Sequence, residues 1–197
     1  MIKLTPQELK NFLKKPEDKE KHLPKQKLGI NVKESILKYN QNCQVEVFYN
    51  SDYISIIFNN TKLLSLNDMF SILQYRKYEL FAYKKMWQEL IFKALENKPN
   101  LPKFSQDCEI VLFRQSAKLV DNDSLSVMFK FIIDALKLDK KLPNKPFVIS
   151  EDNPSVIHNI KLIQEKSKEN IVAIRLQRNT HKTKSSLEEF KKLNFIY

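Results

Sequence analysis

Two aspartates that lie one residue apart, Asp121 and Asp123, are the side chains of this 197-residue chain best suited to chemistry. They begin an amphipathic segment whose apolar residues recur every three and four positions, which predicts a helix up to Leu136. Lys130 follows Asp123 by seven residues, about 10 Å along that helix, and helical side chains lean toward the N-terminus. We therefore expect one short element to present two carboxylates and a cation together.

A third carboxylate, Asp152, lies in the acidic turn at residues 151–154. Mg²⁺ prefers a few carboxylate oxygens completed by water and by phosphate oxygens of a substrate. Two such ions can hold the attacking and the leaving oxygen of a phosphodiester displacement, and Lys130 would neutralise the charge that develops there. The residue types indicate a candidate metal site made of Asp121, Asp123 and Asp152.

The same residues also have ordinary structural explanations. Asp123 is in a position typical of a helix N-cap, and the residues before it can form a plain turn. Lys130 and Asp134 are spaced as an ion pair along one helix face. Spacing alone leaves both interpretations open.

The elements that must position these residues are predicted by apolar periodicity. Alternation predicts strands and a longer period predicts helices, which together favour an α+β fold. We expect Trp87 in the buried stripe of its helix and a hairpin turn at residues 167–170. The expected strands are 53–58, 109–113, 147–149, 156–162 and 171–176, and the expected helices cover 80–95 and 123–136, with shorter ones starting at Thr5, near residue 31 and at Ser185.

The composition limits the class of partner. Lys and Arg number 34 against 23 Asp and Glu, a net charge of +11, which suits phosphate backbones or anionic lipid and equally a plain lysine-rich surface. No apolar run is long enough for a membrane span, and the basic residues are not gathered on one amphipathic helix. Cys43 and Cys108 form no metal or disulfide pattern, so we expect a cytoplasmic protein without a membrane partner. The single glycine, Gly29, excludes a glycine-rich phosphate loop.

Residues 119–136, LVDNDSLSVMFKFIIDAL, resemble the RusA-like Holliday junction resolvases. That family has an acidic pair in the form DxDNL, then a helical lysine and a D-A-L ending. The resemblance covers about residues 52–178. Three further features agree in order and spacing: the Ser65-Leu66-Asn67 segment after the first strand, Tyr83-Lys84 to Trp87 in the next helix, and the acidic turn with Asp152.

The resemblance implies one RusA-like α+β domain at residues 51–178, with a mixed sheet flanked by helices, between a helical extension at 1–50 and a tail at 179–197. It implies a homodimeric, Mg²⁺-dependent endodeoxyribonuclease, with Mn²⁺ as a possible substitute. Such an enzyme resolves Holliday junctions or other branched DNA in recombination and repair. The implied catalytic residues are Asp121, Asp123, Asp152 and Lys130, of which the three aspartates hold the metal, and the implied DNA-binding residues are Asn67, Arg114 and Lys118.

The chain also departs from the family pattern. Ser124 replaces the Asn after the second aspartate, Leu64 replaces a Pro, and the usual arginine run is reduced to Arg114 and Lys118. These departures motivate an alternative of another class, a catalytically silent nucleic-acid-binding or assembly protein with the same fold. A third alternative keeps the enzyme but broadens its substrate to flaps or forks.

Overall fold

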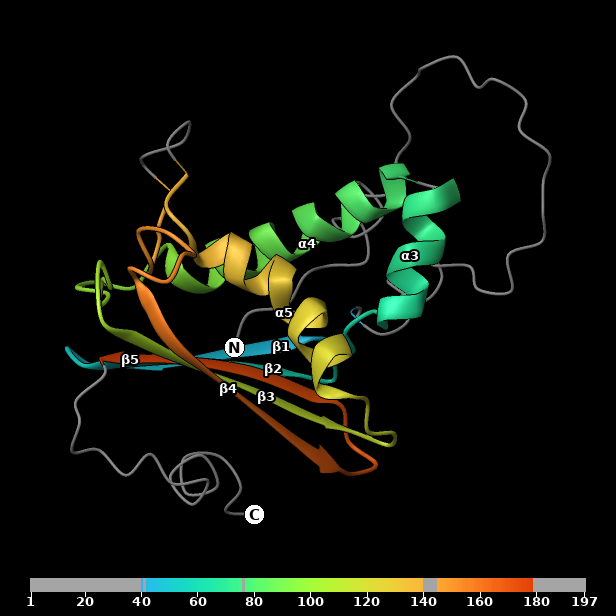
Figure 1. Cartoon of the computed structure of the whole chain (residues 1–197). Coiled ribbons are helices and arrows are strands. Elements are labelled where there is room, and N and C mark those ends of the chain that lie inside the picture. Colours follow the sequence, from blue (N-terminus) through green and yellow to red (C-terminus); the bar gives the residue numbers. More distant parts are fainter. Residues whose placement is uncertain (1–39, 41, 76, 140–144, 179–197) are drawn as a thin grey trace.

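A mixed sheet with helices packed on one of its faces forms the described part of the chain (Figure 1). The computed structural model describes residue 40 and residues 42–75, 77–139 and 145–178. The strands are β1 Gln44–Tyr49, β2 Tyr53–Asn59, β3 Cys108–Ser116, β4 Ile157–Lys166 and β5 Ile171–Arg178. The helices are α3 Leu66–Tyr75, α4 Lys77–Leu95 and α5 Asn122–Leu136.

The strands follow one another in the order β1-β2-β5-β3-β4. Strand β4 runs parallel to β3, whereas the other three pairings are antiparallel. The predicted α+β class, with a mixed sheet and helices, is therefore confirmed. None of the helices in these residue ranges is long and apolar enough to cross a membrane.

The main core lies between the sheet and the helices. Alternate residues of β2, such as Ile56 and Phe58, are fully buried there, because every second side chain of a strand points to the same face of the sheet. Trp87 of α4 is also fully buried and meets Phe58 edge to face, with ring centroids 5.0 Å apart. The prediction that Trp87 belongs to the core is confirmed.

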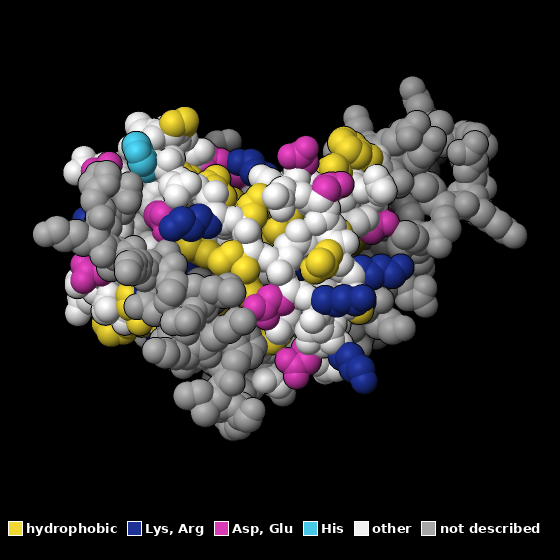
Figure 2. Space-filling view, turned by 60° about the horizontal axis from the view of Figure 1, so that its bottom comes forward, with side chains coloured by type: hydrophobic (Ala, Val, Ile, Leu, Met, Phe, Trp, Pro, Cys, Tyr) yellow, Lys and Arg dark blue, Asp and Glu magenta, His cyan; other side chains and the backbone are white. Residues whose placement is uncertain are grey.

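The opposite face of the sheet carries a second, smaller apolar cluster. It consists of Ile57, Val111, Phe113, Ile171 and Ala173. In the view that brings this side of the molecule forward, Lys and Arg side chains are interspersed with Asp and Glu around hydrophobic ones (Figure 2). The charge visible there is mixed, so this view gives no reason to place a phosphate-binding surface on that side.

Two expected features of the sheet differ in the structure. Strand β1 lies within the segment 1–50 that the sequence assigns to an extension, so the sheet begins at Gln44. Only one residue of β1 is buried, as is typical of an edge strand, so apolar periodicity does not predict it. Asn50 closes the turn to β2 by accepting hydrogen bonds from Asp52 N and Tyr53 N. The predicted hairpin of the last two strands is wrong, because β3 lies between β4 and β5. Their connection passes the end of β3, where Ser167 N donates to Ser116 O.

Other expectations are met only in part or lie elsewhere. Residues 147–149 form isolated bridges at Ile149 with Phe104 and Lys137, not a strand. Helix α3 was not expected, although Ser65 and Asp68 give it a reciprocal cap in which Ser65 Oγ donates to Asp68 Oδ2 and Asp68 N donates to Ser65 Oγ. The helices expected at Thr5 and Ser185 lie outside the described residues, and so does nearly all of the one near residue 31.

Candidate functional site

Asp121 is the N-cap of α5, and it has the extended backbone conformation of that position. Its Oδ1 accepts a hydrogen bond from Ser124 N at 2.8 Å, so Asp121, and not Asp123, is the capping residue. Hydrogen bonds from Ser124 lower the pKa of Asp121, which keeps the exposed carboxylate ionised. Asp123 lies in the first turn of the helix and is exposed as well.

Side chains from β3 and β4 fix the start of α5. Gln164 donates to Val120 O at 2.6 Å and accepts from Val120 N at 3.0 Å, so it binds both backbone groups of the residue before Asp121. Arg114 Nη1 donates to Lys118 O at 2.8 Å and lies 3.4 Å from Gln164 Oε1. We call Arg114, Gln164 and Val120 the strand clamp. Sequence reasoning missed Gln164, because only the parallel β3–β4 register, which pairs it with Arg114, reveals its role.

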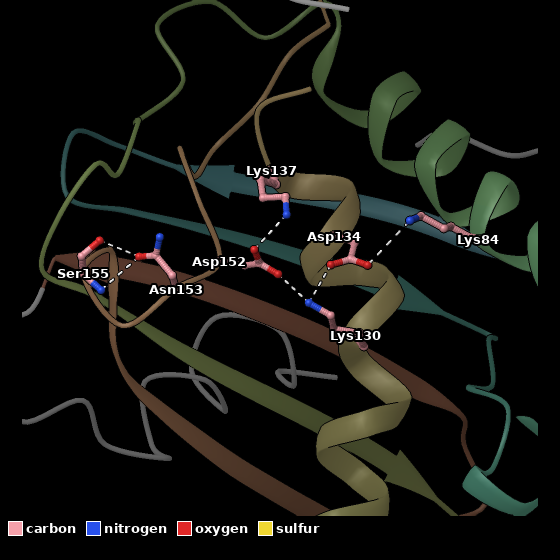
Figure 3. A network of polar contacts seen from close by, with 7 residues as sticks. All are labelled: Lys84, Lys130, Asp134, Lys137, Asp152, Asn153 and Ser155. Carbon is pink, nitrogen blue, oxygen red and sulfur yellow. Dashed lines mark hydrogen bonds and ion pairs between the residues drawn. The ribbon is translucent and has the colours of Figure 1, made fainter. Parts of the chain in front are cut away.

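Lys130 and Asp152 meet in a network of five charged side chains (Figure 3). Lys130 Nζ lies 2.5 Å from Asp152 Oδ2 and 2.8 Å from Asp134 Oδ1. Lys137 Nζ lies 2.8 Å from Asp152 Oδ1, and Lys84 Nζ lies 3.8 Å from Asp134 Oδ2. We call these five residues the lysine–aspartate network. The i,i+4 ion pair of Lys130 with Asp134 is as the sequence predicts. The expectation that the Lys130 ammonium is directed to the start of the helix is wrong, because it meets Asp134 on the C-terminal side.

The turn that carries Asp152 is closed by its own neighbour. Asn153 Oδ1 accepts hydrogen bonds from Ser155 N at 3.0 Å and from Ser155 Oγ at 2.5 Å. Asn153 O accepts from Val156 N and Ile157 N, which joins the turn to the start of β4. The backbone around Asp152 is therefore held by local hydrogen bonds, and its side chain faces α5 (Figure 3).

The network strongly favours its charged forms. Hydrogen bonds from Lys130 and then Lys137 hold the pKa of Asp152 well below its usual range. Burial lowers the pKa of Lys130, but hydrogen bonds to Asp134 and Asp152 outweigh this and raise it overall. The hydrogen bond to Asp152 likewise raises the pKa of Lys137. All three groups are therefore charged over the whole physiological pH range.

The three predicted metal ligands are not brought together as one ligand set. Both oxygens of Asp152 are engaged by lysines beside the C-terminal half of α5, whereas Asp121 and Asp123 lie at its other end. Lys130 is about 10 Å of helix away from Asp123. Across residue 40 and the ranges 42–75, 77–139 and 145–178, no group of three His, Cys, Asp or Glu side chains is placed to hold one metal ion. As arranged here, Asp121, Asp123 and Asp152 do not fit a shared metal.

The three predicted DNA-binding residues, in contrast, line one pocket. Asn67 comes from α3, Arg114 from β3 and Lys118 from the loop before α5, and the pocket between them has a volume of about 730 Å³. Arg114 is buried, and this burial lowers the pKa of its guanidinium without removing its charge. The basic segment 137–145 is described only at residues 137–139 and 145.

Other nucleophilic groups are poorly placed for chemistry. Burial raises the pKa of Cys43 and of Cys108 to about 12, so neither thiol is ionised at neutral pH. His158 is exposed on β4 and does not belong to the core. The lysine–aspartate network and the pocket thus hold the best candidates for function. Comparisons with protein-family models, curated proteins and solved structures found no match for this chain.

Proposed function

We propose that this protein is a homodimeric, metal-dependent endodeoxyribonuclease that acts on branched DNA such as a four-way junction. The observation that carries the proposal is the contact between Lys130 and Asp152. These residues are 22 positions apart, and the resemblance assigns both to one catalytic site. A homodimer suits the substrate because a four-way junction has two-fold symmetry.

The cations of the lysine–aspartate network suit a phosphate backbone. Asp134 and Asp152 hold the ammonium groups of Lys84, Lys130 and Lys137 close together. The side chains of Lys130 and Lys84 stay partly exposed, at 53% and 42%. When a phosphodiester approaches, the ammonium groups would donate to its phosphate oxygens in place of the carboxylate oxygens, at low net cost in free energy. In this proposal Lys130 and Lys137 hold the backbone near the reacting phosphate.

The pocket supplies a second set of contacts to the same DNA. Asn67 and Lys118 are exposed at its edge, and they can bind phosphate or sugar oxygens. The strand clamp joins this pocket to Asp121. Gln164 binds the backbone of Val120, which lines the pocket and directly precedes Asp121. Mg²⁺, or Mn²⁺ in its place, is the metal that the resemblance implies. Because Asp152 lies apart, Asp121 and Asp123 are the aspartates that would hold it in this proposal.

Binding of a labelled four-way junction and of a linear duplex with the same sequences, measured by fluorescence anisotropy, tests the DNA proposal. We expect tighter binding of the junction and a steep fall in affinity between low and moderate salt. Lys130→Ala should reduce the slope of log affinity against log salt by about 1, because one phosphate contact is lost. Lys98→Ala, at an exposed position after α4, is the matched control and should leave the slope unchanged. Equal affinity for both substrates, or a flat response to salt, would contradict the proposal.

A second candidate function is a catalytically silent protein that binds branched DNA. It is favoured by the lysines that engage both oxygens of Asp152 and by the separation of this residue from Asp121 and Asp123. Titration calorimetry with Mn²⁺ separates the two functions. A nuclease should bind the metal and lose it in the Asp121→Asn/Asp123→Asn double variant, whereas the silent protein should show no binding that depends on these residues.

A further inference from the structure

The pocket that contains Asn67, Arg114 and Lys118 combines an apolar floor with a polar edge. Leu63, Leu64 and Met128 contribute buried apolar surface to its lining. Its volume of about 730 Å³ lies within the range of sites that enclose small organic ligands. The floor therefore suits the face of a planar, weakly polar group such as a nucleobase.

Tyr83 fixes the shape of that lining. Its side chain is fully buried, and its hydroxyl accepts a hydrogen bond from Leu64 N at 3.1 Å. This contact ties the segment before α3 to α4 and holds Leu64 in place beside the pocket.

The polar edge is basic. Lys118 is exposed, and Arg114 makes its two hydrogen bonds within the described residues through Nη1 alone. The one acidic side chain in the lining, Asp68, caps α3 with Ser65 and is outnumbered by Lys62, Arg114 and Lys118. The charge offered to a ligand at this edge is therefore positive, as a phosphate requires.

We infer that this pocket takes an unpaired nucleotide of branched DNA, with its base on the apolar floor and its phosphate beside Lys118 and Arg114. This inference rests on the proposed function and adds to it the feature of the DNA that is recognised. Unpaired nucleotides at a branch are cheap to extrude, because they have already lost part of their pairing and stacking. Val120 also lines the pocket, so the extruded nucleotide would lie beside Asp121.

The test compares three junctions of one sequence. The first carries a single unpaired nucleotide at the branch, the second has an abasic residue at that position, and the third is fully paired. We expect the wild type to bind the first about tenfold more tightly than the second, the loss expected when one base contact is removed. Equal affinity for the first two junctions would overturn the pocket inference while the proposed function stands. No binding to any of the three would overturn both.

A variant that blocks the pocket tests whether the unpaired nucleotide binds there. Ala117 is exposed in the loop that lines the pocket, so Ala117→Trp should fill the pocket without disturbing the core. This variant should bind the first two junctions equally, with the affinity of the wild type for the abasic one. A variant that keeps the tenfold preference would overturn the inference, because the base would then bind elsewhere.

Two further variants test the edge of the pocket and the specificity of the effect. Asn67→Ala, a milder change at the pocket edge, should weaken the preference in the same direction, and Lys98→Ala should leave it unchanged. Thermal unfolding of each variant checks that it is folded.

Competition with free dAMP tests whether the pocket binds a free mononucleotide instead of a nucleotide of DNA. Binding of dAMP at micromolar concentration that leaves the junction bound would identify a mononucleotide site and overturn the inference for DNA.

Discussion

Asp152 is the residue on which the candidate site depends most, because it joins the loop before β4 to α5 through two ion pairs. Its side chain is only 19% exposed, whereas those of Lys130 and Lys137 are 53% and 31% exposed. Partly exposed pairs are weakened by solvent and by the entropy of the lysine chains, so each contributes little alone. The network holds two carboxylates and three cations in place and contributes modestly to stability.

Asp152→Asn should lower the free energy of unfolding at neutral pH by about 1 kcal/mol. Because the folded-state pKa of Asp152 is lowered, its contribution is fully present above the ordinary carboxyl pKa of about 4. The contribution is lost only as the pH falls through the lowered value. Urea unfolding between pH 3 and pH 8 measures the difference between the two proteins. A difference that already vanishes near pH 5 would show that the lysines do not hold Asp152 in solution.

At the scale of elements, the start of α5 combines a cap with an anchor to the sheet. Asp121 caps the helix, and the strand clamp holds the preceding residue to β3 and β4. Exposed carboxylates can thus be positioned by a rigid backbone although their own side chains make few contacts. The same arrangement means that a substitution of Asp121 can change stability and function for separate reasons.

Asp121→Asn separates these two effects, because Asn is as good a helix cap as Asp. This variant should unfold at the temperature of the wild type, whereas Asp121→Ala should unfold at a lower temperature. Asp123→Asn should also keep the wild-type value, because Asp123 does not cap the helix. Differential scanning calorimetry of the three variants measures this. A large loss of stability in Asp121→Asn would mean that its negative charge, and not only its hydrogen bond, holds the helix.

Gln164→Leu removes the two hydrogen bonds to Val120 and should destabilise the protein by about 1–2 kcal/mol. Gln115→Leu is the matched control, because Gln115 contacts Glu165 on the neighbouring strand at 3.3 Å and does not bind the start of α5 within the described residues. Hydrogen exchange should show faster opening of the first turn of α5 in the Gln164 variant alone. If both variants behave alike, Gln164 has no special part in fixing the helix.

Several elements could be predicted from the sequence because the residues that face the main core repeat at a regular period. The stripe in α5, with Leu125, Phe129 and Ile132 fully buried, repeats as the sequence predicts, and Ile56 and Phe58 alternate in β2 as expected. The order of strands could not be predicted that way, because a four-residue connection usually joins neighbouring strands and here it passes the end of β3.

At the scale of the whole molecule, the site depends on contacts between distant segments. The meeting of Lys130 with Asp152 was expected only from the resemblance, since no local pattern relates positions 22 apart. The separation of Asp152 from Asp121 and Asp123 could not be foreseen, because it depends on how the turn at Asn153 directs one side chain. The pocket likewise collects residues from α3, β3 and the loop before α5, which come together only in the folded chain.

The net charge of +11 also acts at this scale. It draws the chain toward any polyanion, so affinity for DNA alone does not identify a function. Selectivity for a branch and cleavage beside it are the properties that separate an enzyme from a basic surface. The proposed function assigns both properties to the few residues of the lysine–aspartate network, the pocket and the start of α5.

Cleavage of a synthetic four-way junction by the wild type and by Asp121→Asn/Asp123→Asn, with and without Mg²⁺ or Mn²⁺, is the most direct measurement. The double variant keeps the helix cap, so a loss of activity in a folded protein would report the two carboxylates. We predict paired nicks that require the metal and disappear in the double variant. Binding of the junction without cleavage under either metal would contradict the nuclease and leave the silent binding protein, and neither binding nor cleavage would contradict a role on branched DNA.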